Sequence, residues 1–352
     1  MEKILMKGNE ACAEAAIRAG CKCYFGYPIT PQNEITAYMS KHLPKIDGGV
    51  FVQAESEIGA INMIYGCAGS GSRCMTSSSS PGISLKSEGI SYIVGADLPC
   101  VIVNVQRGGP GLGTIQPSQA DYWQATKAIG HGDMRIPILA PASAQEMVDM
   151  TLKAFRIAEE YRTPVMILAD GLLGQMMEPV SFDNKSLPEA DSSWAANGHA
   201  NSRPKNTINS LYLDPLELEQ KIKERFKRYE QITEKEVGAV YDKGAKIVVA
   251  AYGSTARVAR SAVDKARAEG INAGLFRPQT LWPFPKKQLI EATENAKVVL
   301  VTEMSMGQMV DDVKMSLEFK LPVQFFGRTG GFVPNPDEIL TKIKELEVSD
   351  NA

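Results

Sequence analysis

Short apolar runs alternate with helical stretches along the first half of the chain. The runs lack regular polar interruptions, which is typical of strands buried on both faces of a parallel sheet. Three helical stretches are clear between them: Asn9–Ala19, which we expect Asn9 to cap, Ser56–Ala68 and Ser143–Glu160. The predicted strands are Tyr24–Tyr27, Val50–Ala54, Cys74–Ser77, Cys100–Gln106, Pro137–Ala140 and Pro164–Ala169. The alternation predicts an α/β domain over residues 1–181.

A second, smaller set of alternating runs covers residues 245–347. Its clearest helix is Thr255–Glu269, and its predicted strands are Ile247–Tyr252, Ala273–Phe276, Lys297–Thr302 and Val323–Phe326. Residues 182–244 separate the two sets. They are polar and rich in turn formers as far as residue 210, and a helix is then expected to begin at Asp214 and Pro215. The pattern predicts two α/β domains joined by a linker and a connecting helix.

The composition excludes two classes of function. The chain has 352 residues and a formal net charge of −3, whereas a nucleic-acid surface normally shows clustered Lys and Arg. No apolar run approaches the roughly 18 to 20 residues that span a bilayer, and the N-terminus does not have the pattern of a signal peptide. We expect a cytoplasmic protein that binds neither nucleic acid nor membrane.

The six cysteines lie between positions 12 and 100. They form no C-x-x-C pair, and no histidine stands at a zinc-ligand offset from them. The nearest pair, Cys21 and Cys23, is too closely spaced for the usual iron–sulfur patterns. We therefore expect reduced thiols, several of them buried, and no metal site or cluster in this chain.

The run Tyr27-Pro28-Ile29-Thr30-Pro31 places a hydroxyl where a strand passes into a helix. Thr30 can cap that helix and Pro31 suits its first position, because the missing N–H would have no partner there in any case. The free N–H groups of a helix N-terminus also favour an anion. Local chemistry alone leaves both possibilities open, a simple cap or a binding site.

Glu57 occupies a similar junction, in the run E-S-E-I-G-A between a predicted strand and a helix of small residues. A carboxyl group at such a junction can be shielded from water, which disfavours its ionised form and suits it to share a proton with a ring nitrogen. The alternative is an acidic residue that only complements the helix dipole. The residues themselves do not choose between the two.

Arg107 follows a strongly apolar predicted strand. The carboxyl ends of parallel strands are where open α/β sheets bind ligands, and a guanidinium there can hold a carboxylate with two hydrogen bonds. The loop that follows, G-G-P-G-L-G, lacks the Lys-Ser/Thr ending of a phosphate-binding P-loop. We expect a flexible loop that faces the substrate. A surface Arg paired with an acid remains the alternative.

The order and spacing of Tyr27–Pro31, Glu57 and Arg107 resemble the α subunit of 2-oxoacid:ferredoxin oxidoreductases, over nearly the whole chain. The resemblance implies the pyrimidine-binding domain of a thiamine diphosphate enzyme, followed by a transketolase C-terminal-like domain. It implies that Glu57 is catalytic and hydrogen-bonds the cofactor's pyrimidine ring, which Tyr27, Pro28 and Ile29 also help to bind. Thr30 and Arg107 would then bind the 2-oxoacid.

The same resemblance implies several partners. A β subunit would hold the diphosphate and Mg²⁺ of the shared cofactor. A γ subunit and a ferredoxin-like subunit would complete the complex, with [4Fe-4S] clusters on the partner subunits, ferredoxin as electron acceptor and coenzyme A as co-substrate. The sequence agrees with a diphosphate and Mg²⁺ held by another subunit, because the faint metal–diphosphate pattern at Asp170 lacks the Asn that should follow it.

The loop after Arg107 bears on the substrate. The run R-G-G-P-G-L-G, followed by Q-P-S-Q-A-D-Y, looks most similar to the branched-chain members, which oxidise 3-methyl-2-oxobutanoate. The 2-oxoglutarate members tend to have a polar Ser-Thr after the Gly-Gly-Pro, where this chain has Gly111-Leu112. The alternatives are a 2-oxoglutarate or pyruvate enzyme, transketolase-like transfer without redox chemistry, and a noncatalytic scaffold subunit.

Overall fold

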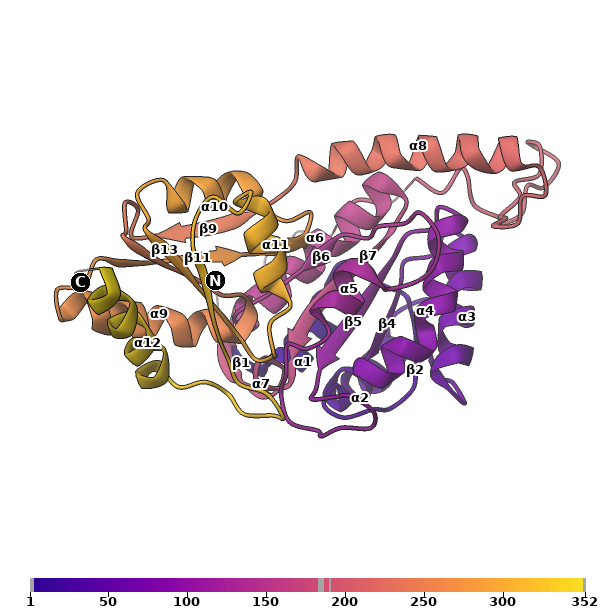
Figure 1. Cartoon of the computed structure of the whole chain (residues 1–352). Helices are drawn as coiled ribbons and strands as arrows, with labels where there is room; N and C mark the ends of the chain where they lie inside the picture. The colour runs from indigo at the N-terminus through magenta and orange to yellow at the C-terminus, as the bar shows by residue number, and fades with distance from the viewer. Residues whose placement is uncertain (1–2, 183–186, 190, 351–352) are drawn as a thin grey trace.

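The computed structural model describes residues 3–182, 187–189 and 191–350, so part of the predicted linker, 183–186 and 190, lies outside the described residues. Figure 1 shows two α/β bodies side by side, with the long helix α8 (Pro215–Thr233) along the outside of the first. Asp214 caps α8 by accepting a hydrogen bond from the backbone N–H of Leu216 (2.9 Å), as the sequence predicts.

The first body is built on a sheet that, among the described residues, has seven strands in the order β12-β6-β7-β5-β4-β2-β3. All neighbours are parallel except β12 and β6. The strands are β2 (Cys23–Gly26), β3 (Val50–Gln53), β4 (Cys74–Ser78), β5 (Cys100–Gln106), β6 (Ile138–Leu139), β7 (Pro164–Asp170) and β12 (Thr280–Trp282). A small antiparallel pair, β1 (Ile4–Lys7) and β8 (Met177–Val180), lies beside it and was not predicted.

Helices cover both faces of this sheet. Side chains along β5 alternate between two cores: Ile102 packs with α3 and α4, while Val101 and Val103 pack with α1, α2 and α6. This period of two is what a strand buried on both faces requires. The helices are α1 (Gly8–Arg18), α2 (Asn33–His42), α3 (Glu57–Gly69), α4 (Ser80–Gly95), α5 (Tyr122–Lys127), α6 (Ala144–Tyr161) and α7 (Gly171–Gln175), with a 3₁₀ turn η1 (Leu43–Lys45).

The strand order reverses between β2 and β4. From β2 the chain moves outward to β3, then returns to place β4 on the other side of β2. Open α/β sheets bind ligands in the crevice that such a reversal leaves at the carboxyl ends of the strands. The segments that leave β2, β3, β4 and β5 therefore converge at one edge.

The second body has a smaller sheet, in which the described residues form five strands in the order β14-β13-β10-β11-β9. Only β9 is antiparallel, to β11. The elements are β9 (Gly238–Tyr241), β10 (Ile247–Ala250), α9 (Gly253–Ala268), β11 (Ala273–Pro278), α10 (Lys286–Thr293), β13 (Val298–Glu303), α11 (Met309–Ser316), β14 (Val323–Gly327) and α12 (Pro336–Asp350). Each strand predicted over residues 245–347 is present, whereas β12 and, in the predicted linker, β9 were missed.

The two bodies are bonded to each other through buried polar groups. The Gln119 side chain, with no exposed surface, donates to Tyr252 O (2.8 Å) and accepts from Thr255 Oγ1 (2.7 Å). Arg277 on β11 donates twice to Glu146 on α6, at 2.7 Å each. Strand β12 comes from the second half of the sequence but pairs with β6 of the first sheet.

Several local predictions need correction. Helix α1 begins at Gly8 rather than after a capping Asn9, because the Asn9 amide instead donates to the carbonyl oxygen of Pro31 (2.8 Å). Helix α2 begins at Asn33, so Thr30 does not cap it and Pro31 is not its first residue. The predicted surface loop is partly buried, since Ala195 has no exposed surface and its neighbour Ala196 donates to Gly69 O (2.9 Å).

Five of the six cysteines are buried, as predicted, and all six are free thiols. In the described part of the chain, no helix is both long and apolar enough to cross a membrane. The predicted domain boundaries stay a prediction.

Candidate active site

The loop after β2 carries the Tyr27–Pro31 motif into the crevice. Gln32, itself fully buried, holds the loop in shape: its backbone N–H donates to Ile29 O (3.1 Å) and its side-chain amide donates to Tyr27 O (3.2 Å). The Thr30 hydroxyl accepts a hydrogen bond from the Asn33 side chain (3.2 Å) rather than from a helix N–H. The motif is therefore a compact turn fixed by Gln32.

Glu57 is the first residue of α3. Ser56 caps the helix by accepting from the backbone N–H of Gly59 (3.1 Å), which fixes the direction in which α3 leaves β3. Only 6 % of Glu57 is exposed, and within the described residues no hydrogen-bond donor reaches its carboxylate. A buried carboxylate without a donor is costly, so this arrangement suits a ligand that supplies one.

Helix α4 approaches the Glu57 carboxylate so closely that only a glycine fits between them. A Cβ atom at Gly82 would lie 2.7 Å from Glu57 Oε1 and 2.1 Å from Ser78 Oγ. The neighbouring hydroxyls of Ser78 and Ser79 are buried and, within the described residues, have no hydrogen-bond partner. The Glu57 carboxylate and the Ser78 hydroxyl therefore both approach Gly82, close to where β4 passes into α4.

Ser80, the first residue of α4, has a φ of +25°, a conformation that L residues rarely adopt. Its hydroxyl donates to Asp121 (2.7 Å) and accepts from the backbone N–H of Arg107 (3.1 Å). Asn104 also donates to Asp121 (3.0 Å). Burial raises the pKa of Asp121, and these hydrogen bonds oppose the effect. The network ties the ends of β4 and β5 together.

Arg107 is 6 % exposed and lies at the end of β5. Its guanidinium donates to two carbonyl oxygens, Thr30 O (3.0 Å) and Leu112 O (3.2 Å), while Nε is buried without a partner in the described residues. The structure therefore brings together Arg107 and Thr30, as predicted for a shared site. The alternative of a surface Arg paired with an acid is wrong.

The glycine-rich loop after Arg107 is bonded to itself. Gly108 N donates to Gln116 O (3.0 Å), and Thr114 N donates to Gly108 O (2.8 Å). Gly111 and Gly113 have φ values of +70° and +61°, which explains the need for glycine at these turns. The Leu112 side chain is 83 % exposed, so the loop contacts Arg107 through its backbone.

Lys86, on the second turn of α4, was not among the predicted site residues. It is fully buried, and its ammonium donates to Thr76 Oγ1 (2.6 Å). Burial lowers the pKa of Lys86 to about 7, against the opposing effect of Glu57. The sequence did contain a signal, because Ile83, Lys86 and Ile90 share one helical face whose other members are apolar.

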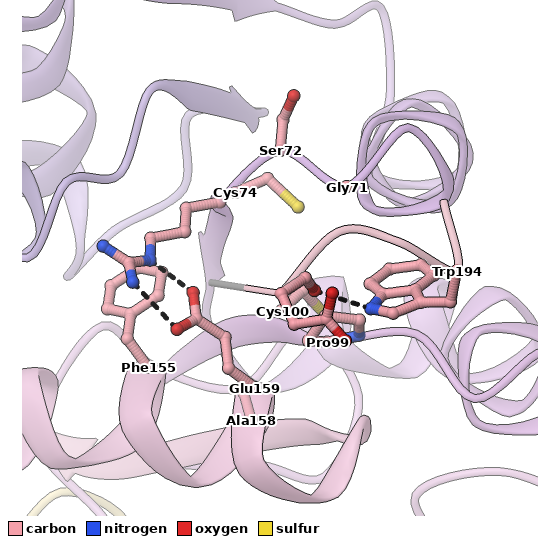
Figure 2. A pocket seen from close by; sticks show the side chains of 11 residues that line it. Gly71, Ser72, Cys74, Pro99, Cys100, Phe155, Ala158, Glu159 and Trp194 are labelled. Atoms are coloured by element: carbon pink, nitrogen blue, oxygen red, sulfur yellow. Dashed lines mark hydrogen bonds and ion pairs between the residues drawn. The ribbon is translucent and has the colours of Figure 1, made fainter. Parts of the chain in front are cut away.

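A small cavity at the opposite end of the sheet is separate from this site (Figure 2). It is lined by the amino ends of β4 and β5, at Cys74 and Cys100, with Trp194 of the linker and the Arg73–Glu159 ion pair. Its volume of about 20 Å³ has room for one water molecule.

Asp170, where the sequence faintly suggested a metal–diphosphate motif, has a structural role. Its carboxylate caps α7 and accepts a hydrogen bond from the Ser254 hydroxyl (2.6 Å).

No group of three or more His, Cys, Asp or Glu within the described residues could hold a metal ion. The candidate residues instead supply the carboxylate of Glu57, the guanidinium of Arg107, the hydroxyls of Ser78 and Ser79, and the backbone of a fixed turn. Such a set can hydrogen-bond a polar heterocycle and bind an organic anion beside it.

Comparison with known proteins finds two matching family models and several full-length relatives. The family model described as "Pyruvate flavodoxin/ferredoxin oxidoreductase, thiamine diP-bdg" matches residues 14–242, and "Pyruvate:ferredoxin oxidoreductase core domain II" matches residues 245–339. The ketoisovalerate oxidoreductase subunit VorB of Methanothermobacter marburgensis is 48 % identical, over 99 % of both chains. The 2-oxoglutarate synthase subunit KorA of the same organism is 37 % identical, over 98 % of this chain and 100 % of KorA.

Two solved structures are also similar. The 2-oxoglutarate:ferredoxin oxidoreductase from Magnetococcus marinus, with 2-oxoglutarate, coenzyme A and succinyl-CoA bound, has a TM-score of 0.87 and 27 % identity. The match covers 98 % of this chain and 65 % of that one. A split gene transketolase has a TM-score of 0.61 at 15 % identity, over 97 % of both chains, and shows the fold alone. These similarities confirm the predicted α/β fold class, and they show that the chain belongs to the 2-oxoacid:ferredoxin oxidoreductase family, as an α subunit.

Proposed function

We propose that this subunit serves the oxidative decarboxylation of a branched-chain 2-oxoacid, 3-methyl-2-oxobutanoate (ketoisovalerate), to its acyl-coenzyme A. The observation that carries the proposal is the 48 % identity with ketoisovalerate oxidoreductase subunit VorB over 99 % of both chains. Identity with the 2-oxoglutarate synthase subunit KorA is lower, at 37 %. The Gly111-Leu112 pair after Arg107, noted in the sequence, favours the same substrate.

The crevice fits the pyrimidine end of thiamine diphosphate. The Glu57 carboxylate has no donor among the described residues, the hydroxyls of Ser78 and Ser79 lack partners, and Gly82 has no Cβ to fill the space between them. A ring nitrogen and an amino group would satisfy such groups. The backbone of Tyr27, Pro28 and Ile29 would border the ring on the side of β2.

The cofactor, when bound, supplies the carbon nucleophile and the electron sink for decarboxylation. Glu57 would hold a proton in a hydrogen bond to the pyrimidine ring, in a site from which α3 and α4 exclude water. Arg107 would bind the substrate carboxylate or keto oxygen, because its guanidinium is buried and now holds only neutral carbonyl oxygens. Thr30 would orient the same groups through its hydroxyl.

The remaining components follow from family membership and are part of the proposal. A β subunit would hold the diphosphate and Mg²⁺. A γ subunit and a ferredoxin-like subunit would complete the complex, with [4Fe-4S] clusters on the partner subunits and ferredoxin as the final acceptor. Coenzyme A would take the acyl group, and the complex would act in the cytoplasm.

The experiment is an anaerobic assay of the complex that co-purifies with this chain, following viologen reduction in the presence of coenzyme A. The panel contains 3-methyl-2-oxobutanoate, 2-oxoglutarate and pyruvate at equal concentrations. We expect the highest kcat/KM with 3-methyl-2-oxobutanoate. A preference for 2-oxoglutarate or pyruvate would overturn the substrate assignment. No reduction with any of the three, in a complex that retains its clusters and cofactor, would favour a transferase or a scaffold.

A further inference from the structure

Lys86 is a buried cation that the proposed mechanism does not use. It has no exposed surface, and among the described residues its ammonium has one hydrogen-bond acceptor, Thr76 Oγ1, at 2.6 Å. An ammonium has three donors and is strongly hydrated in water, so burying it with one acceptor is unfavourable. Such a residue needs an explanation beyond packing, because a methionine would fill the same space.

Lys86 lies one helical turn after Gly82, the residue of α4 that approaches the Glu57 carboxylate. Gly82 and Lys86 are four residues apart on α4, so they lie one above the other on the same face. At Gly82 this face is so close to the first turn of α3 that a Cβ would lie 2.7 Å from Glu57 Oε1. Thr76, which anchors the ammonium, stands two residues before Ser78 on the same side of β4. Gly82, which the Glu57 carboxylate and the Ser78 hydroxyl both approach, and Lys86, which is bonded to Thr76, therefore lie one helical turn apart along α4.

Glu57 is the group of opposite charge that acts on Lys86. From β5, Cys100 is the other titratable neighbour, but burial raises the pKa of its thiol, so it stays neutral near pH 7. Strand β4 contributes the neutral Thr76. The titratable residue of β7, Asp170, is bound to α7 and Ser254 instead. Among the described residues, Glu57 is therefore the anionic group that acts on the Lys86 ammonium.

We propose that Lys86 is a positioning residue for Glu57: its buried ammonium, anchored by Thr76, favours the ionised carboxylate and so moves the proton that Glu57 shares with the cofactor ring toward the ring nitrogen. The inference rests on the proposed role of Glu57. On this proposal Lys86 would act through Glu57, without touching cofactor or substrate.

A pH dependence follows from the chemistry of an amine in this site. Burial lowers the pKa of Lys86 to about 7, so the ammonium is present at pH 6 and largely absent at pH 8. At pH 6 the ammonium is present and attracts the Glu57 carboxylate, so removing it should slow proton removal from the cofactor. At pH 8 the wild-type amine is already neutral, and its removal should cost little.

The test is deuterium exchange at C2 of bound thiamine diphosphate, measured by rapid acid quench and NMR on the assembled complex without 2-oxoacid. The variants are Lys86→Met and Lys86→Gln; the second keeps a donor for Thr76 without the charge. Lys153→Met, a half-buried lysine on α6 across the sheet, is the matched control. The dissociation constant of thiamine diphosphate is measured for every variant at both pH values.

We expect both Lys86 variants to exchange within about threefold of wild type at pH 8 and about tenfold more slowly at pH 6, since one neighbouring charge changes a proton equilibrium by about one pH unit. Lys153→Met should match wild type at both. A loss of equal size at pH 6 and pH 8, or none, would overturn the inference, because it would leave Lys86 only a packing role. If Lys86→Met does not assemble, Lys86→Gln decides alone.

Glu57→Gln distinguishes a failure of the role inferred for Lys86 from a failure of the role proposed for Glu57. Loss of exchange in this variant at both pH values, with a pH-independent result for Lys86, would refute the inference and keep the proposed function. Near-normal exchange in Glu57→Gln would remove the role of Glu57 and with it the inference.

Discussion

Lys86→Met should make the stability of the chain less dependent on pH. In the folded chain burial lowers the pKa of Lys86 to about 7, against 10.5 for an unhindered lysine. Between these values the unfolded chain binds one more proton than the folded chain, so the free energy of unfolding rises with pH. Below pH 7 both states are protonated, and the full cost of burying the ammonium is present. Above pH 10.5 both are neutral and the cost is absent.

The magnitude follows from proton linkage. The gap between 10.5 and about 7 corresponds to about 5 kcal/mol in full. Each pH unit inside the window changes the free energy of unfolding by about 1.4 kcal/mol for one proton. Between pH 7 and pH 9 the free energy of unfolding of the wild type should therefore rise by about 2 to 3 kcal/mol more than that of Lys86→Met. Ionisation of the buried cysteines, which begins near pH 9 in the unfolded chain, affects both proteins equally and cancels in the difference.

The assay is urea unfolding of both chains at four pH values from 7 to 9, followed by circular dichroism and tryptophan fluorescence. The quantity of interest is the difference in unfolding free energy between the two proteins. At pH 7 the variant should be the more stable of the two, and its advantage should shrink steadily as the pH rises. A difference that stays constant across the range would refute the reasoning, since it would mean that Lys86 does not change its protonation on unfolding.

Two further variants test the site and the contact between the domains. Gly82→Ala should weaken thiamine diphosphate binding at least about tenfold, because its methyl group would displace the Glu57 carboxylate and the Ser78 hydroxyl; calorimetric titration measures this, and unaltered affinity would show that the close approach is unimportant. Gly66→Ala on α3, which has open space around it, is the control and should bind normally. Glu146→Gln should lower the free energy of unfolding by about 3 kcal/mol, because it leaves the buried Arg277 cation unpaired. Adding Arg277→Met should recover part of that loss in denaturant unfolding, and a Glu146→Gln effect below about 1 kcal/mol would contradict the expected desolvation cost.

The parallel strands could be predicted because their burial on both faces leaves apolar runs that few other structures produce. Cys100–Gln106 was predicted residue for residue, and the carboxyl-end position of Arg107 followed from it. Strand β12 could not be found in this way. It has three residues, and its partner β6 lies about 140 positions earlier, so nothing local records the pairing. Sequence periodicity reports which residues are buried, not what buries them.

The roles of the predicted site residues stay a prediction, and several of their contacts differ from those expected. Thr30 was expected to cap a helix, yet the buried Gln32 extends the turn and α2 begins only at Asn33. Local propensity favours Thr and Pro at a helix start, and tertiary hydrogen bonds overrode it. Lys86 was missed because a lysine between two isoleucines at helical spacing is usually a solvated residue at the edge of an apolar face. Only the packing of α4 against α3 and β4 shows that it is enclosed.

The pairing of β12 with β6 has a consequence for synthesis on the ribosome. Residues 1–181 contain six of the seven strands of the first sheet, but the edge at β6 stays open until residues 280–282 have been made. Gln119, likewise, has no partners until Tyr252, Thr255 and Met304 emerge. An open strand edge invites pairing with other chains. The nascent first domain should therefore be the stage at which this protein most needs a chaperone, and its sheet can close only after residues 280–282 have left the ribosome.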